Sequence, residues 1–190
     1  MRLFLALELD AATAEALYFA IAPLRALEPG LAWMPATKLH LTIKFLGDAD
    51  EGRVSGLVAA ASLVAATHRP FGMRLGGVSA FPNFRRPRIV WLGVESEPRL
   101  ELLHHDLELA CMERGYEVEG RPFRPHVTLA RVREQLPAER VRVLARAARR
   151  IAFFATENVD RLTLFDGATG TSAPTGARYR RLHAATLGGR

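Results

Sequence analysis

HLTIKFLG at residues 40–47 and HVTLARV at residues 126–132 begin alike, with His, an apolar residue, Thr and a second apolar residue. Successive side chains of an extended strand point to opposite faces. In each segment, His and Thr therefore share one face, while the apolar residues lie on the other face against a core. The repeat of the pattern 86 residues later indicates an internal duplication.

Helix and strand patterns alternate around these two segments. The predicted helices cover 11–26, 51–67, 98–114 and 137–150, and the further predicted strands cover 2–9, 71–75, 89–94, 151–158, 159–165 and 178–187. A loop rich in Gly, Thr and Pro is expected over 166–177. Few connections resemble the single-helix crossover that joins parallel strands. The sequence therefore predicts an α+β fold with mainly antiparallel sheets, and we expect one domain over 1–190.

The composition fits an ordinary globular protein. The chain has 190 residues, 49% of them hydrophobic, and no apolar run approaches the roughly 18–20 residues of a membrane span. The opening segment MRLFLALELD lacks the long apolar region of a signal peptide, so we expect a cytoplasmic protein without a membrane partner. Cys111 is the single cysteine, which excludes an internal disulfide and favours a buried thiol.

Positive charge is concentrated at the end of the chain. Residues 121–190 contain 14 Arg and no Lys against five acidic residues, whereas residues 1–120 carry a small excess of acid. Such a basic segment favours an anionic partner, and the planar guanidinium suits phosphate. The alternative is that the arginines of 137–150 cover the solvated face of a helix.

Two histidines suit proton transfer during in-line displacement at phosphorus. The attacking water loses a proton on one side of the phosphorus, and the departing ribose oxygen gains one on the other. Imidazole titrates near neutrality, so one ring acts as base while the other acts as acid. The threonine hydroxyls can donate to the phosphate oxygens that gain charge. The sequence contains no HExxH motif, carboxylate cluster or Cys/His ligand set, and we predict neither a metal nor another cofactor.

With these motifs and their flanks, the chain resembles the two-histidine (2H) phosphoesterases. It is most similar to their bacterial and archaeal RNA 2′,3′-cyclic phosphodiesterase branch, historically called 2′-5′ RNA ligases. The resemblance covers nearly the whole chain and rests on RLFLAL (2–7), WMPATKLHLTIKFLG (33–47), FPNFRRPRIVWLGV (81–94), RPFRPHVTLARV (121–132) and GARYRRL (176–182).

The resemblance implies a bilobal fold. Two pseudo-symmetric lobes, each a small mainly antiparallel sheet with outer helices, would enclose a cleft with one His-x-Thr motif from each lobe (40–43 and 126–129). It also implies hydrolysis of an RNA 2′,3′-cyclic phosphate end to a 2′-phosphomonoester without metal or ATP, and 2′-5′ ligation in reverse. Fragments of tRNA are one class of such RNA. Nothing in the sequence requires more than a monomer.

Carried over by motif, His40 would be the general acid and His126 the general base, with Thr42 and Thr128 holding phosphate oxygens. Two arginines near the second motif, Arg131 and Arg124, are candidates for phosphate contact.

Strand parity gives two further expectations. Lys44 shares the parity of His40 and Thr42, which points it toward the cleft or its rim, and Phe45 has the parity of the core. In FPNFRRPR (81–88), aromatic and basic residues interleave, which suits either base stacking or an ordinary exposed basic loop.

Two other functions remain open from the sequence. One is an RNA-binding or end-protecting module, motivated by the basic C-terminal third. The other keeps the two histidines but acts on a different substrate, such as an ADP-ribose cyclic phosphate or a 2′-5′ oligonucleotide. Paired proton-transfer groups favour an enzyme, because a binding module has no use for them.

Overall fold

The computed structural model describes residues 1–167 and 179–188. Its helices are α1 (Ala11–Ala20), α2 (Ala22–Leu27), α3 (Val54–Thr67), α4 (Pro98–Met112) and α5 (Ala138–Ala148). Its strands are β1 (Arg2–Glu8), β2 (Ala32–Trp33), β3 (His40–Asp48), β4 (Phe71–Phe81), β5 (Ile89–Val94), β6 (His126–Arg131), β7 (Phe154–Val159), β8 (Arg161–Asp166) and β9 (Arg180–Thr186). The predicted loop 166–177 lies mostly outside the described residues.

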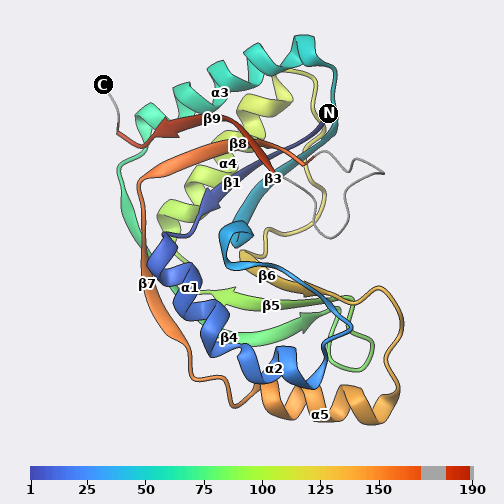
Figure 1. The fold of residues 1–190 in the computed structure, drawn as a ribbon. Coiled ribbons are helices and arrows are strands. Elements are labelled where there is room, and N and C mark those ends of the chain that lie inside the picture. Colours follow the sequence, from blue (N-terminus) through green and yellow to red (C-terminus); the bar gives the residue numbers. More distant parts are fainter. Residues whose placement is uncertain (168–178, 189–190) are drawn as a thin grey trace.

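Nine strands of the described residues form one sheet in the order β7-β4-β5-β6-β3-β1-β8-β9, with β2 added beside β6. Each of these pairings is antiparallel. The prediction of an α+β fold with antiparallel strands is therefore confirmed. Figure 1 shows α3 and α4 beside the half that contains β1, β3, β8 and β9, and α2 and α5 beside the half that contains β4, β5 and β6.

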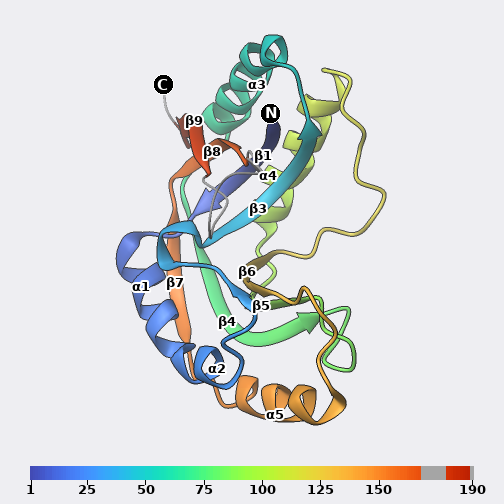
Figure 2. The same ribbon diagram turned by 45° about the vertical axis from the view of Figure 1, so that its right-hand side comes forward.

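The two halves of the sheet meet at a single residue pair. Only Leu41 of β3 and Val127 of β6 are paired across the junction, whereas neighbouring strands elsewhere share longer ladders. Figure 2 shows β3 and β6 diverging from this point, so the halves splay apart. Each half contributes one His-x-Thr strand to the junction, in keeping with the predicted duplication.

The two largest differences from the predicted elements lie in the first helix and in β4. The helix expected over 11–26 breaks at Ile21, because Pro23, in the first turn of a new helix that begins at Ala22, has no N–H to continue the preceding turn. The strand expected over 71–75 continues to Phe81. The two glycines that suggested its end instead form an irregularity, with Gly77 at φ 75°, after which pairing with β5 resumes.

The core lies between the sheet and its helices. β1 is buried along almost its whole length, and its leucines pack with those of α3 and α4. Cys111 is buried in this core, as predicted, and burial raises the pKa of its thiol to about 11. Such a thiol is inert at neutral pH and contributes only packing.

Candidate active site

The two motif histidines are held in the same way. The Nδ1 atom of His40 lies 2.7 Å from the carbonyl oxygen of Lys38, and the Nδ1 atom of His126 lies 2.7 Å from the carbonyl oxygen of Arg124. A carbonyl oxygen only accepts, so each Nδ1 carries the hydrogen and donates it. In each neutral ring, Nε2 then has the lone pair and is the atom available for proton exchange.

The register across the junction brings the two motifs together. Leu41 and Val127 are partners in an antiparallel pair. One residue to either side, the His of each motif therefore stands opposite the Thr of the other. All four side chains are partly exposed, while the residues between them are buried. Both strands therefore show the predicted alternation, with His and Thr on the partly exposed face and the apolar residues on the core face.

The surroundings of His40 act on its pKa in both directions. Burial lowers the pKa below its ordinary value, and this effect prevails. The hydrogen bond to the Lys38 carbonyl and the nearby carboxylate of Glu8 raise it, while the positive charges of Arg131 and His126 lower it. Glu8 is the direct cross-strand partner of His40 on β1. The negative charge of the Glu8 carboxylate therefore favours the cationic form of the His40 ring.

His126 lies among different charges. Burial again lowers the pKa, the hydrogen bond to the Arg124 carbonyl raises it, and the charge of Arg131 lowers it. Arg131 therefore acts on both histidines, as expected of a cation close to the cleft. The two rings are thus equivalent in their hydrogen bond but differ in their charged neighbours, because Glu8 is felt at His40.

An aromatic group surrounds His40. The ring of Phe4 stacks on the imidazole with centroids 5.2 Å apart, and Tyr179 meets it edge-on at 5.2 Å. Phe165 also stacks on Phe4, with centroids 5.2 Å apart, and its ring lies 6.2 Å from the imidazole. These residues come from β1, from β8 and from the residue before β9. The sequence alone did not indicate them, because only the sheet order brings them together.

A cavity of about 390 Å³ opens beside this aromatic group. His40 and Tyr179 line it together with three charged residues, Glu8, Lys38 and Arg181. Arg181 donates to the Glu8 carboxylate at 2.7 Å, so the acid of this cavity is already paired with a cation.

A second aromatic group surrounds His126. Phe81 meets the imidazole edge-on at 4.9 Å and stacks on Trp91 at 4.8 Å. Phe81 and Trp91 also line a larger cavity, of about 710 Å³, which extends to α5. The backbone oxygen of Arg124 accepts the hydrogen bond from His126, and Arg124 also belongs to the lining of this cavity. The sequence left the role of 81–88 open, and the structure places Phe81 beside the histidine.

The parity predictions for Lys44 and Phe45 are wrong. The pairing of β1 with β3 skips Ile43, since Leu5 pairs with Lys44 and Ala6 with Thr42. The extra residue is a bulge that exchanges the two faces for the residues that follow, up to a second irregularity at Leu46. As a result, Phe45 is 56% exposed on the face of His40, near Phe4, while Lys44 is 3% exposed inside the protein.

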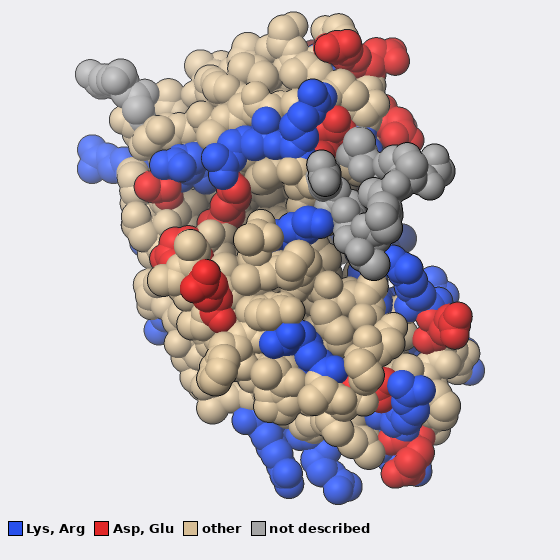
Figure 3. Space-filling view, in the orientation of Figure 1, with Lys and Arg blue, Asp and Glu red and all other residues tan. Residues whose placement is uncertain are grey.

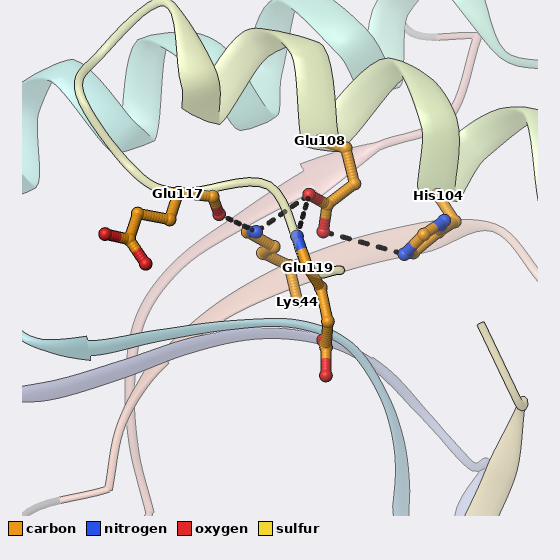
Figure 4. Close-up of polar contacts among 5 residues, drawn as sticks. All are labelled: Lys44, His104, Glu108, Glu117 and Glu119. Atoms are coloured by element: carbon orange, nitrogen blue, oxygen red, sulfur yellow. Dashed lines mark hydrogen bonds and ion pairs between the residues drawn. The ribbon is translucent and has the colours of Figure 1, made fainter. Parts of the chain in front are cut away.

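Lys44 belongs to a buried polar cluster behind the sheet (Figure 4). Its ammonium donates to Glu108 of α4 at 2.8 Å and to the carbonyl oxygen of Glu117 at 2.6 Å. The same carboxylate accepts the backbone N–H of Glu119 at 3.0 Å, and His104 lies 3.6 Å from its other oxygen. The cluster fastens β3 to α4 and to the segment that leads into β6.

An antiparallel α+β fold with two His-x-Thr strands side by side is the arrangement of a 2H phosphoesterase. The chain belongs to the 2′-5′ RNA ligase superfamily, because the sequence model of that family matches residues 10–171. The resemblance inferred from the motifs is therefore confirmed.

Several curated relatives are named RNA 2′,3′-cyclic phosphodiesterase. One from Thermus thermophilus is 36% identical over 149 residues, which cover 74% of this chain and 72% of the relative. One from Geobacillus stearothermophilus is 39% identical over 103 residues, 54% of this chain and 33% of the relative. One from Bacillus subtilis is 33% identical over 99 residues, 52% of this chain and 54% of the relative. The chain thus spans about a third of the Geobacillus protein and about half of the Bacillus protein.

Solved structures agree over the whole fold. The protein TT0787 of Thermus thermophilus superposes with a TM-score of 0.77 at 28% identity, covering 100% of this chain and 99% of that one. Escherichia coli LigT in complex with 3′-AMP superposes with a TM-score of 0.71 at 27% identity, covering 98% and 97%.

The described residues contain neither a membrane-spanning helix nor a set of metal ligands. None of their helices is long and apolar enough to cross a membrane. Within residues 1–167 and 179–188, no three His, Cys, Asp or Glu side chains gather as a set of metal ligands.

Proposed function

We propose that this protein hydrolyses RNA 2′,3′-cyclic phosphate ends to 2′-phosphomonoesters by two-histidine acid–base catalysis. The observation that carries the proposal is the matched pair of histidines in one cleft, each with Nδ1 bound to a carbonyl and Nε2 left for proton exchange. The names of the curated relatives support the same activity. The whole-chain similarity to LigT bound to 3′-AMP supports a nucleotide substrate.

The charges around the two rings favour one assignment of roles. The neighbouring Glu8 carboxylate favours the cation at His40, which makes this ring the acid. Arg131 lowers the pKa of both rings, so Glu8 is the charge that distinguishes them, and His126, which lacks such a carboxylate, is the base. These are also the roles that the family resemblance implies.

In the proposed reaction, water attacks phosphorus in line with the departing 3′ oxygen. Nε2 of His126 takes the proton of the water as the new P–O bond forms. Nε2–H of His40 gives its proton to the 3′ oxygen as the old P–O bond breaks, which leaves the phosphate on the 2′ oxygen. Thr42 and Thr128 donate to the non-bridging oxygens, and Arg131 balances their charge. Arg124 is a further candidate for phosphate contact.

The proton transfers need no metal or ATP, and in reverse the two histidines would exchange roles to form a 2′-5′ bond. The regiochemistry and the reverse ligation rest on the family resemblance. The monomeric state, the cytoplasmic location and the use of tRNA fragments stay predictions from the sequence, as does the division of the domain into two lobes.

The test is incubation of the purified protein, in EDTA and without ATP, with a short RNA ending in a 2′,3′-cyclic phosphate. We expect ring opening to a 2′-phosphate, and each of His40→Ala and His126→Ala should lower kcat by about 10²–10⁴-fold. His105→Ala is the matched control, because His105 is exposed on α4 and belongs to neither motif.

A 3′-phosphate product would keep the catalytic pair but reverse the orientation of the ribose. RNA binding without turnover, unchanged in both variants, would instead favour the RNA-binding module.

A further inference from the structure

We propose that the 710 Å³ cavity beside His126 binds the RNA nucleotides immediately 5′ of the cyclic-phosphate nucleotide. This inference rests on the proposed function, since it extends the same substrate out of the cleft. An RNA with a cyclic phosphate at its 3′ end continues only through the 5′ oxygen of its last ribose. The rest of the strand must therefore leave the cleft along one surface of the protein.

The cavity begins at Phe81, beside His126, and continues away from that ring. Phe81 contacts the His126 imidazole edge-on and also lines the cavity. From there the cavity follows the outer edge of β4 to α5. Among the described strands, β7 pairs with β4 only from Phe71 to Gly76, so the edge from Val78 to Phe81 is not covered by a strand. Figures 1 and 2 both show the β4–β5 loop beside the beginning of α5.

The lining combines the two features of single-strand binding sites, which are aromatic rings and positive charge. Three aromatic side chains, each partly exposed, line the cavity: Phe81, Phe84 and Trp91. Four exposed arginines from three segments line it as well: Arg85, Arg124, Arg142 and Arg149. Among the described residues, no acidic side chain lines it, although Glu139, one turn before Arg142 on α5, pairs with that guanidinium. In Figure 3, basic side chains project from the part of the surface that contains α5.

The cavity beside His40 fits the rest of the strand less well. It is smaller, at about 390 Å³, and the carboxylate of Glu8 belongs to its lining. Both volumes lie within the range of about 300–1,000 Å³ that small-ligand sites occupy, but the larger cavity has more room for additional nucleotides. Size and charge together therefore direct the strand past His126.

Helix α5 offers a test with a built-in control. Arg142 and Arg149 face the cavity, whereas Arg146 and Arg150 are exposed on or just after the same helix and do not line the cavity. The variants Arg142→Ala/Arg149→Ala and Arg146→Ala/Arg150→Ala remove the same charge. Alanine favours a helix, so both variants should fold, as circular dichroism and urea unfolding would verify.

Each protein is assayed on a nucleoside 2′,3′-cyclic monophosphate and on a tetranucleotide with the same 3′ end. For the cavity variant, we expect KM for the tetranucleotide to rise roughly tenfold, as two exposed charge contacts are lost. Turnover of the mononucleotide should be unchanged, and the control variant should match the wild type on both. The log–log slope of tetranucleotide affinity against salt should also become shallower by about 1.4 in the cavity variant.

A tetranucleotide KM that is unchanged, or that rises equally in both variants, would overturn the proposal. So would an equal loss on the mononucleotide, because the cavity would then hold the terminal nucleotide. Fluorescence anisotropy with a labelled tetranucleotide ending in a 3′-phosphate measures binding without turnover. If the wild type opens neither cyclic phosphate but binding still weakens only in the cavity variant, the cavity assignment stands and the proposed catalysis fails.

Discussion

Lys44→Met should destabilise the protein strongly while leaving the proposed chemistry of the folded protein intact. Lys44 and Glu108 are 3% and 6% exposed, and their side chains meet at 2.8 Å. Methionine fills the same space but leaves the Glu108 carboxylate buried, with the Glu119 N–H as its remaining hydrogen bond and His104 at 3.6 Å. Breaking a buried pair from one side typically costs about 3–5 kcal/mol. We expect a loss in that range in the free energy of unfolding.

The assay is urea unfolding followed by circular dichroism, completed as a double-mutant cycle. Lys44→Met/Glu108→Leu removes both charges and should recover most of the loss, because apolar replacements of whole buried pairs are often neutral. Arg74→Met is the control, since it breaks an exposed pair with Glu95 and should cost at most about 1 kcal/mol. A stable Lys44→Met variant with a large loss of kcat would refute the reasoning, because Lys44 would then act in the cleft.

Three further predictions concern the site itself. Because burial lowers the pKa of both histidines, kcat/KM should peak at a pH below the ordinary imidazole value of about 6.5: it rises as His126 loses its proton and falls as His40 loses its own. Arg131→Ala removes a charge that lowers both pKa values, so the whole pH profile should move to higher pH while KM rises; an unmoved profile would place Arg131 outside the cleft. Gly93→Ala would set a Cβ 2.6 Å from the backbone oxygen of Gly76, and Gly93 pairs with His126, so we expect a loss of about 1–3 kcal/mol in unfolding free energy together with lower kcat. Gly30→Ala, with open space around it, should change neither.

Local patterns in the sequence were sufficient for most of the elements and for the two His-x-Thr strands. The apolar alternation of 40–47 and 126–132 predicted two strands with His and Thr on one face, and the structure has both. Gly115, expected to end the helix that begins at Pro98, adopts φ 77° just after α4. These predictions depend on residues close in sequence, where period and capping decide the structure.

The errors arise where a strand departs from regular geometry. Counting parity past Ile43 placed Lys44 in the cleft and Phe45 in the core, and a bulge reverses both. The bulge depends on how β1 pairs with β3, and the sequence of 40–47 alone does not determine that pairing. The aromatic residues around His40 were not predicted either, because three segments far apart in the sequence supply Phe4, Phe165 and Tyr179.

The duplicated motif also explains why neighbours, rather than the motif, must decide which histidine is the acid. A repeat gives both rings the same hydrogen bond, to the carbonyl two residues before, and therefore the same tautomer. In-line displacement nevertheless needs one protonated ring and one neutral ring at the same pH. Glu8, the cross-strand partner of His40, supplies a difference that the repeat cannot, because its carboxylate is felt at only one of the two rings. Glu8→Gln should therefore move the descending limb of the pH profile, which reports His40, to lower pH, and leave the ascending limb in place. If the ascending limb moved instead, the two histidines would have the opposite roles.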